Sequence, residues 1–463
     1  MKNIKFNKGY LLSISMVSAM GGLLFGYDWV VIGGAKPFYE RFFDITESAN
    51  LQAWAMSSAL IGCILGAVIS GVISDKLGRK RPLLLAALLF TISAFGTGIS
   101  ETYEGFIIYR VIGGLGIGLA SALSPMYIAE VSPSQFRGRF VSLNQMTIVI
   151  GILAAQVVNI LIAEDVPVDV TDEYIRASWN GTIGWRWMFW AELVPAIAFF
   201  VFTFFVPESP RWLMKADQKE KAYPTLEKIG GEIYAKMEIE NIQATLNDVA
   251  QKVDFQALFH PKYRMVLVLG IVLAVFQQWC GINIIFNYAD EIFTAAGYGV
   301  SDTLFNIVIT GSVNLVFTLV AMFTVDKWGR KKLMLLGSLG LAITYLLLGS
   351  AFYFELKGIA VLSLVVIGIG VYAMSLAPIT WVILSEIFPN RIRGGAMAVA
   401  TFSLWIACFV LTYTFPLLNK GFGAAGTFWV YAVICTLGFL FIRKNLPETK
   451  GKSLEEIEKE LVK

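Results

Sequence analysis

The sequence is poor in the residues from which soluble enzymes usually build reactive centres. Its 463 residues include one histidine, His260, and four cysteines. Cys63, Cys280, Cys408 and Cys435 lie far apart and form no CxxC pair, so neither a disulfide framework nor a zinc site is expected. The chain also lacks a recognisable nucleophile–base pair, metal-ligand cluster or phosphate loop. We therefore predict no enzyme, no cofactor, no bound metal and no ATP-driven activity.

Charged side chains are also scarce. They make up 15% of the chain, whereas an average soluble domain carries about 25%. Hydrophobic residues reach 56%, and the net charge of +3 gives no reason to expect a nucleic-acid partner. Uncharged runs such as 265–286 and 358–385 match or exceed the ~20 residues with which a helix crosses a bilayer. The sequence therefore predicts an all-α membrane protein with the lipid bilayer as a partner.

Twelve hydrophobic segments are predicted to cross the membrane as helices. They are residues 11–32, 56–74, 82–100, 106–128, 141–163, 187–206, 265–288, 304–325, 333–354, 358–384, 396–416 and 427–442. This pattern divides the chain into two six-helix halves, 1–206 and 265–442. A polar linker, 207–264, separates them and is expected to form short surface helices at 220–229 and 239–249. A tail, 443–463, follows the last span.

The distribution of Lys and Arg predicts the orientation. Thirty of the 37 Lys and Arg residues fall at the N-terminus, in the loops that follow even-numbered spans, and in the tail, while six fall in the other loops and Arg110 lies within a span. Cytoplasmic loops carry such an excess of positive charge. We therefore expect a multi-pass protein of the cell inner (cytoplasmic) membrane with both termini in the cytoplasm.

Three charged motifs occur twice, about 250 residues apart. The pairs are Asp75 to Arg79 and Asp326 to Arg330, Glu130 with Arg137 and Glu386 with Arg393, and Glu208 and Glu448. The repetition indicates two homologous halves, which in membrane proteins is typical of transporters that rock about a site at the interface between them.

The repeated charges have two explanations. Basic residues fix the topology, but that explains only the cations. Alternatively, the arginines pair with the glutamates across the seam between the halves and close the cytoplasmic side. Exposed ion pairs contribute only ~0–1 kcal/mol each, so a network of them can hold one conformation without trapping it. The predicted cytoplasmic gate comprises Asp75, Arg79, Glu130, Arg137, Glu208, Asp326, Arg330, Glu386, Arg393 and Glu448.

Several specific motifs resemble those of one family. They are Phe25 to Asp28, Asp75 to Lys80, Arg110 to Gly114, Pro125 to Glu130, Pro207 to Trp212, Gln277 to Asn283, Asp326 to Lys331 and Pro447 to Thr449. From about Leu11 to Glu456 the chain resembles the sugar porter family of the major facilitator superfamily, and within it bacterial xylose– or hexose–proton symporters. The resemblance implies the major facilitator fold and a monosaccharide substrate.

The resemblance also implies a central sugar site lined mainly by the second half. Its residues would be the amides Gln145, Gln277, Gln278, Asn283 and Asn314, with Trp381 and Trp405 beside the sugar ring. Amides suit a neutral, hydroxyl-rich ligand because they both donate and accept hydrogen bonds. The alternative is that these amides join helices to one another, as polar residues in membranes often do.

Three positions depart from the pattern of xylose symporters. Ile152 stands where those symporters have a glutamine, and Leu404 stands where they have an amide before Trp405. After the Gln277 motif, where they have two tyrosines in a row, this chain has Asn287 and Tyr288. These changes leave pentose and hexose both open as substrates.

Ionisable residues within a membrane span are functional by default. Asp28 and Arg110 are expected to pair, with Glu192 as a third coupling residue, and the resemblance to symporters assigns Asp28 the proton. Facilitative relatives carry asparagine at this position. We therefore predict proton-coupled sugar import by alternating access, functional as a monomer, with a facilitative uniporter or a sugar sensor as the alternatives.

Overall fold

The computed structural model describes residues 5–167, 170–248, 258, 260–389, 392–452 and 454–461. Within these ranges the regular structure is helical. The side chain of Asp326, one of the predicted gate residues, lies outside the described part of the structure.

The N-terminal half contains the first six spans. Their helices are α1 (Lys8–Phe42), α2 (Ala49–Leu77), α3 (Lys80–Ile99), α4 (Tyr103–Val131), α5 (Arg137–Ile162) and a sixth span built from η1 (Asn180–Gly184), α7 (Trp185–Trp190) and α8 (Leu193–Thr203). A short helix, α6 (Asp172–Ala177), precedes the sixth span.

The C-terminal half contains the other six spans. Its helices are α12 (Pro261–Trp279), α13 (Ile282–Asn287), α14 (Ala289–Ala295), α15 (Val300–Trp328), α16 (Arg330–Tyr353), α17 (Ile359–Met374), α18 (Leu376–Ile387) and α19 (Arg393–Asn445). Although α19 runs for 53 residues, it is two antiparallel limbs joined at Gly423, whose φ of 67° is not helical. Among the residues that the structure describes, eleven long apolar helices supply twelve spans, and the predicted fold class is confirmed.

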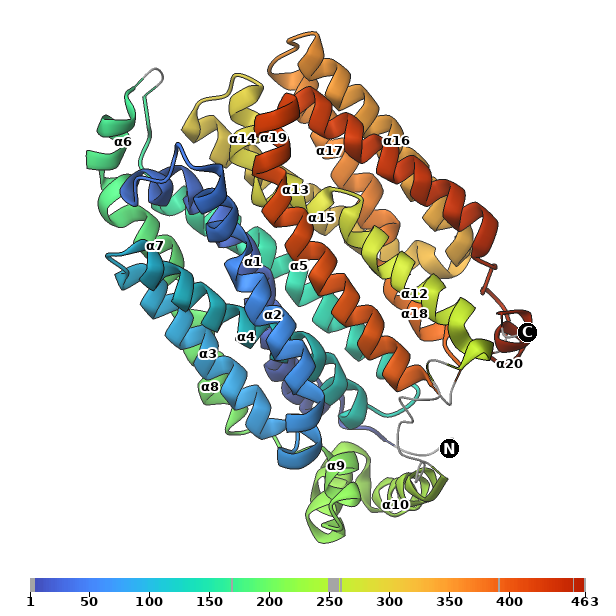
Figure 1. The fold of residues 1–463 in the computed structure, drawn as a ribbon. Helices are drawn as coiled ribbons and strands as arrows, with labels where there is room; N and C mark the ends of the chain where they lie inside the picture. Colours follow the sequence, from blue (N-terminus) through green and yellow to red (C-terminus); the bar gives the residue numbers. More distant parts are fainter. Residues whose placement is uncertain are drawn as a thin grey trace.

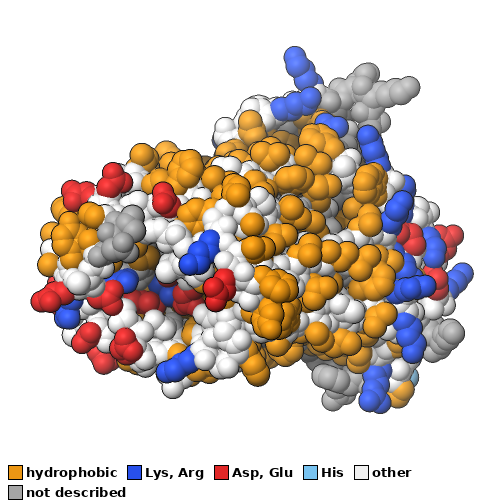
Figure 2. All heavy atoms as spheres, turned by 90° about the horizontal axis from the view of Figure 1, so that it is seen from above, with side chains coloured by type: hydrophobic (Ala, Val, Ile, Leu, Met, Phe, Trp, Pro, Cys, Tyr) orange, Lys and Arg blue, Asp and Glu red, His pale blue; other side chains and the backbone are white. Residues whose placement is uncertain are grey.

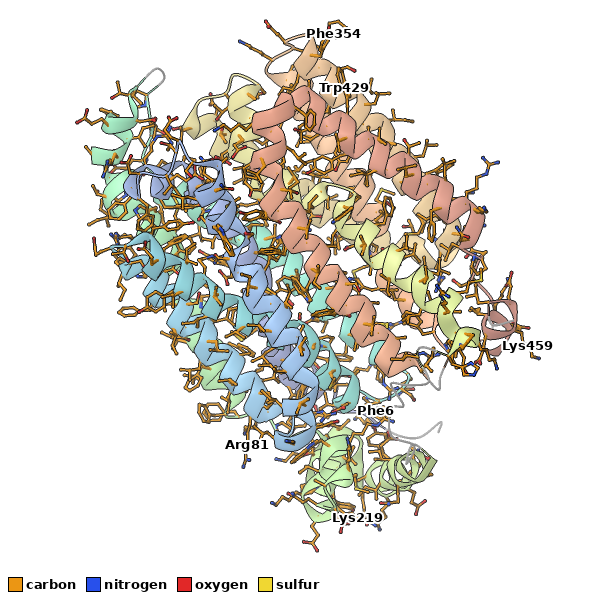
Figure 3. All side chains as sticks on the ribbon, in the orientation of Figure 1. Phe6, Arg81, Lys219, Phe354, Trp429 and Lys459 are labelled. Carbon is orange, nitrogen blue, oxygen red and sulfur yellow. The ribbon has the colours of Figure 1, made fainter. Side chains whose placement is uncertain are left out.

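The linker forms α9 (Pro210–Lys215) and α10 (Lys219–Asp248), which lie together beyond one end of the bundle (Figure 1). Two surface helices were expected at 220–229 and 239–249. In the structure, two helices run through this region and meet at a kink at Gly231, where φ is 81°. We call this end of the molecule the linker side. Figure 3 shows Arg81 and Lys219 there, and Phe354 and Trp429 at the opposite side.

Helices within each half approach closely because glycines face neighbouring backbones. A Cβ atom on Gly62 of α2 would lie 2.1 Å from the carbonyl oxygen of Val111, and one on Gly114 of α4 would lie 1.8 Å from that of Ala59. Close contact of this kind replaces the hydrophobic effect as the packing force within lipid. Hydrophobic side chains cover much of the outer surface, as Figure 2 shows for one face, with most Lys and Arg gathered toward one end.

Candidate transport site

A cavity of about 2410 Å³ lies between the two halves. Its walls come from helices of both halves, including α1, α2 and α5 on one side and α12, α15, α18 and α19 on the other. Toward the linker side it is lined by Asp75, Arg79, Lys215 and Arg330. The cavity therefore reaches from the middle of the bundle to the linker side.

All seven residues predicted to bind sugar line this one cavity. They are Gln145, Gln277, Gln278, Asn283, Asn314, Trp381 and Trp405. Gln145 projects from α5 of the first half and the others from α12, α13, α15, α18 and α19 of the second. The structure thus brings together amides that the sequence spreads over 170 residues.

Three of the amides form a directional hydrogen-bonded chain. The side-chain amide of Asn283 donates to the carbonyl oxygen of Gln278. Gln278 in turn donates to the carbonyl oxygen of Gln277 at 2.5 Å. Gln277 then donates to the hydroxyl of Tyr372 at 2.7 Å. Because every amide oxygen in the middle of the chain accepts from its neighbour, the orientation of these groups is fixed before any ligand arrives.

Tyr372 of α17 was not predicted from the sequence. It lies 95 residues from Gln277 along the chain and lines the same cavity. The only sequence signal for it is a tyrosine within an otherwise apolar span, nine residues before Trp381. Its hydroxyl ends the amide chain and keeps a proton that can be donated to a ligand.

Aromatic rings from both halves meet beside the amides. Trp405 of α19 lies 6.0 Å from Phe25 and 6.1 Å from Trp29 of α1, measured between ring centroids. Trp405 is 5% exposed, whereas Trp381 is 38% exposed, so the two predicted tryptophans differ in their freedom to contact a ligand. Phe25 belongs to a recognised motif, but its role and that of Trp29 were missed because rings in a span usually face lipid or core.

The structure also shows where the three departures from the xylose-symporter pattern lie. Ile152 and Leu404 line the cavity, so two positions of its wall are apolar. Tyr288 is fully buried and donates its hydroxyl to the carbonyl oxygen of Thr412 at 2.7 Å, which commits it to packing. Asn287 is buried with its side-chain oxygen unpartnered.

The predicted coupling pair forms in the structure. Arg110 of α4 donates to the carboxylate of Asp28 in α1 and, at 3.3 Å, to the backbone carbonyl of the same residue. Asp28 is 1% and Arg110 2% exposed. The first span was predicted to end at residue 32, but α1 continues to Phe42, so the pair lies near the middle of the helix. The second carboxylate oxygen of Asp28 has no hydrogen-bond partner.

Glu192 lies close enough to the pair for its charge to act on Asp28 and Arg110. It is 1% exposed, and its Oε1 atom has no hydrogen-bond partner. The cavity wall includes Phe25, Gly26 and Trp29 of α1 but not Asp28, Arg110 or Glu192. The three residues predicted to couple transport to protons therefore lie behind the wall of this cavity, within the first half.

The charged motif of the first half forms a compact network on the linker side. Arg79 makes two hydrogen bonds of 2.8 Å to the carboxylate of Glu130. Glu208 accepts from the backbone N–H groups of Arg79 at 2.8 Å and Lys80 at 3.2 Å, at the N-terminus of α3. A carboxylate there satisfies free backbone donors and opposes the helix dipole. Asp75 lies 3.9 Å from Arg79.

The second half repeats this arrangement. Arg330 lies 3.2 Å from Glu386. Glu448 accepts from the backbone N–H groups of Arg330 and Lys331, at the start of α16. Burial alone would raise the pKa of Glu448, but these donors and the backbone N–H groups of Lys450 and Thr449 hold it below its usual value.

The repeated glycine of the motif has a physical reason. Gly78 and Gly329 have φ values of 89° and 86°, a conformation that L side chains rarely adopt. A Cβ atom would lie 2.2 Å from Glu208 at the first position and 2.7 Å from Glu448 at the second. The motif therefore conserves space for a carboxylate beneath the loop, and not only positive charge.

The ion pairs of the predicted gate differ from expectation in one respect. Arg79 with Glu130 and Arg330 with Glu386 join elements of the same half, not the two halves. Arg137 and Arg393 each donate to a backbone carbonyl at the end of the preceding helix, Ala129 and Phe388. The cavity is lined by Arg79 of one network and by Arg330 of the other.

A buried charged cluster on the opposite side was missed. Lys36 of α1 is 1% exposed, and its Nζ atom lies 3.0 Å from Asp290 and 2.8 Å from Glu291 of α14. The first span had been expected to end at residue 32, which placed Lys36 in a loop. The helix continues to Phe42 because Pro37 is tolerated within it and Lys36 is neutralised by partners from the other half.

The fold and the cavity define a class of protein: a two-half membrane transporter with a site between its halves. A family model described as sugar (and other) transporter matches residues 14–461. The chain belongs to this family, whose members are transporters and not enzymes.

Individual relatives agree with this assignment. The chain is 40% identical to the D-xylose-proton symporter of Escherichia coli (strain K12), covering 98% of this chain and 96% of that protein. It is 42% identical to the arabinose-proton symporter of Bacillus subtilis (strain 168), with the same coverage. The fold matches the inward open conformation of the xylose transporter XylE from E. coli with a TM-score of 0.85 and 39% identity, over 97% of this chain and 100% of that one.

Proposed function

We propose that this protein imports a monosaccharide together with a proton by alternating access. The observation that carries the proposal is the pairing of two sites in one bundle. An amide-lined cavity lies between the halves, and a buried Asp28–Arg110 pair lies directly behind its wall. The pentose–proton symport named for two relatives supports the same reading.

The sugar site follows from the chemistry of the cavity. The amides Gln145, Gln277, Gln278, Asn283 and Asn314 bind hydroxyl groups, while Trp381 and Trp405 contact the apolar faces of the ring. A net contribution of ~0.5–1.5 kcal/mol per hydrogen bond gives binding weak enough for release. The apolar Ile152 and Leu404 leave a pentose or a hexose as candidate substrates.

Proton coupling follows from the pair behind the wall. In the conformation described here Arg110 donates a hydrogen bond to the carboxylate of Asp28. When the helices move and Arg110 withdraws, a buried carboxylate without a cation favours the protonated state. Glu192 adds a second buried carboxyl group in the same half. A facilitative uniporter, the alternative, does not require a carboxyl group that takes up a proton. For the sugar sensor, no described segment supports a signalling role.

Orientation and gating complete the proposal. The linker side carries the excess of Lys and Arg, so we assign it to the cytoplasm, with both termini inside and the protein in the inner membrane. The state described here is then inward-facing. Rocking of the halves would bring the two linker-side networks together and close the cavity. One chain holds both sites, so the monomer is the proposed transport unit.

The test is uptake into proteoliposomes with an imposed pH gradient, alkaline inside. Labelled xylose, arabinose, glucose and galactose are supplied singly, with and without a protonophore. Symport predicts accumulation of one of them above the external concentration, and collapse of that accumulation with the protonophore. Equilibration without accumulation would establish a uniporter instead.

A further inference from the structure

The buried cluster around Lys36 connects the two halves on the side away from the cavity opening. The Nζ atom of Lys36 in α1 contacts Asp290 and Glu291 of α14, and it also lies 3.4 Å from Glu40, one turn further along α1. Its ammonium group lies 5.6 Å from the centre of the Tyr288 ring. A lysine of one half is therefore enclosed by carboxylates of both.

Neighbouring polar groups hold the carboxylates in place. Gln52 of α2 donates to Glu40 at 3.1 Å, and Asn419 of α19 donates to Glu291 at 3.2 Å. The backbones approach each other beside the cluster, because a Cβ atom on Gly33 of α1 would lie 3.0 Å from the carbonyl oxygen of Phe286. Direct packing and the ion cluster thus seal the same part of the seam.

The charges of the cluster do not balance. One ammonium group faces three carboxylates, and Oδ1 of Asp290 has no hydrogen-bond partner. The phenol groups that face the cluster, from Tyr39 and Tyr288, add no positive charge. Lys36 is therefore the group that holds the carboxylates of α1 and α14 together. Removing one partner of a buried ion pair leaves uncompensated charge, which is strongly unfavourable.

The two ends of the molecule differ in how charge is paired. On the linker side Arg79 and Arg330 pair with glutamates of their own halves, whereas on the opposite side Lys36 pairs across the seam. The cross-seam pair is intact while the cavity reaches the linker side. We propose that Lys36, with Asp290 and Glu291, is the clamp that closes the external side of the transporter and stabilises its inward-facing state. This inference rests on the proposed alternating-access function.

Opening the external side requires α1 and α14 to separate, so Lys36 must leave its partners in each cycle. Lys36 contacts all three carboxyl groups, so its departure removes the cation that they share. The clamp therefore sets the balance between the two states. Its loss favours the outward-facing state, in which the linker side of the cavity is closed.

The experiment measures access to the cavity from the linker side. Ser142 of α5 lines the cavity there and is half-buried, and the four native cysteines are buried. In inside-out vesicles a membrane-impermeant maleimide labels a Ser142→Cys reporter. Adding Lys36→Met is expected to slow labelling at least about threefold, as the inward-facing population falls. The control is Lys420→Met, which removes an exposed lysine on the side of the molecule where Lys36 lies. It is expected to leave the labelling rate of the reporter unchanged.

A charge exchange separates the clamp from a general requirement for lysine. Lys36→Glu combined with Glu291→Lys returns a cation to the cluster from the other half, and we expect it to restore the labelling rate of the reporter. Unchanged labelling in a folded Lys36→Met protein would overturn the proposal. So would slow labelling of a folded exchanged protein, because the exchange returns a cation to the cluster. The labelling experiment uses neither sugar nor a proton gradient. A negative result therefore counts against the clamp and leaves the symport proposal intact, and a failure of the uptake test leaves the clamp proposal intact.

Discussion

Arg110 of α4 donates to both the carboxylate and the backbone carbonyl of Asp28 in α1. Both residues belong to the first half, whereas most of the predicted sugar contacts belong to the second. Under the proposed coupling, a proton on Asp28 would therefore affect a bound sugar through helix movement or through the cavity wall next to it. Phe25 and Trp29, on the same helix and in ring contact with Trp405 of the second half, supply that connection.

Tyr372 gives a graded test of the amide chain. Tyr372→Phe removes the hydroxyl that accepts from Gln277 and frees that amide to rotate. One neutral hydrogen bond contributes ~0.5–1.5 kcal/mol, so we expect sugar affinity to fall about 2- to 10-fold. Isothermal titration of the purified protein measures the change.

A matched control comes from the same half of the protein. Tyr345→Phe removes another buried hydroxyl group. Tyr345 lies in α16 and does not line the cavity. It should leave affinity unchanged. Equal losses in the two variants would mean that Tyr372 acts through packing alone.

Close helix contacts predict where an added methyl group is not tolerated. Gly62→Ala places a Cβ atom 2.1 Å from the carbonyl oxygen of Val111 and must push α2 away from α4. Gly71→Ala on the same helix meets open space. We expect the first variant to lower the melting temperature in detergent markedly and the second to keep or slightly raise it, since alanine favours helices. Similar melting temperatures would argue against the packing described.

The lowered pKa of Glu448 predicts a dependence of stability on pH. A carboxyl whose pKa is lower in the folded than in the unfolded protein stabilises the fold above its unfolded pKa. That stabilisation disappears as the pH falls through the folded pKa. At neutral pH the wild type should therefore have a higher melting temperature than Glu448→Gln. The difference in free energy of unfolding should be less than ~1 kcal/mol because the site is partly exposed.

This difference should vanish in acid, below the usual pKa of a glutamate. Melting curves of the two proteins from pH 7 downward test the prediction. If the difference in melting temperature persists unchanged at the lowest pH, the effect of the substitution comes from the shape of the Glu448 side chain and not from its charge.

Sequence reasoning predicted the twelve spans and the family because hydrophobic length and repeated motifs are local signals. It also named seven residues that the fold brings to one cavity, three of them from the Gln277 motif and the others from the family resemblance. It missed Tyr372 because nothing in the local sequence shows which face of α17 meets α12. It missed Lys36 because a lysine within a span is stable only with partners, and those partners lie 254 and 255 residues away.

Element boundaries failed for a related reason. Hydropathy ended the first span at residue 32, but a helix ends where its backbone donors and acceptors find other partners, which for α1 is after Phe42. The linker helices were divided by composition, whereas the structure divides them at Gly231. The repeated motifs predicted charged residues near one another on the linker side, but no sequence pattern shows which pairs form in a given conformation.

The proposed coupling of sugar to protons is tested most directly by external pH. De-energised cells that express the protein are suspended in weak buffer, and xylose, glucose, galactose and arabinose are added singly, with cells carrying an Asp28→Asn variant alongside. We predict that one sugar makes the medium alkaline in wild-type cells and leaves it unchanged with Asp28→Asn. Equal alkalinisation by Asp28→Asn cells, or sugar equilibration without any pH change in wild-type cells, would contradict the account.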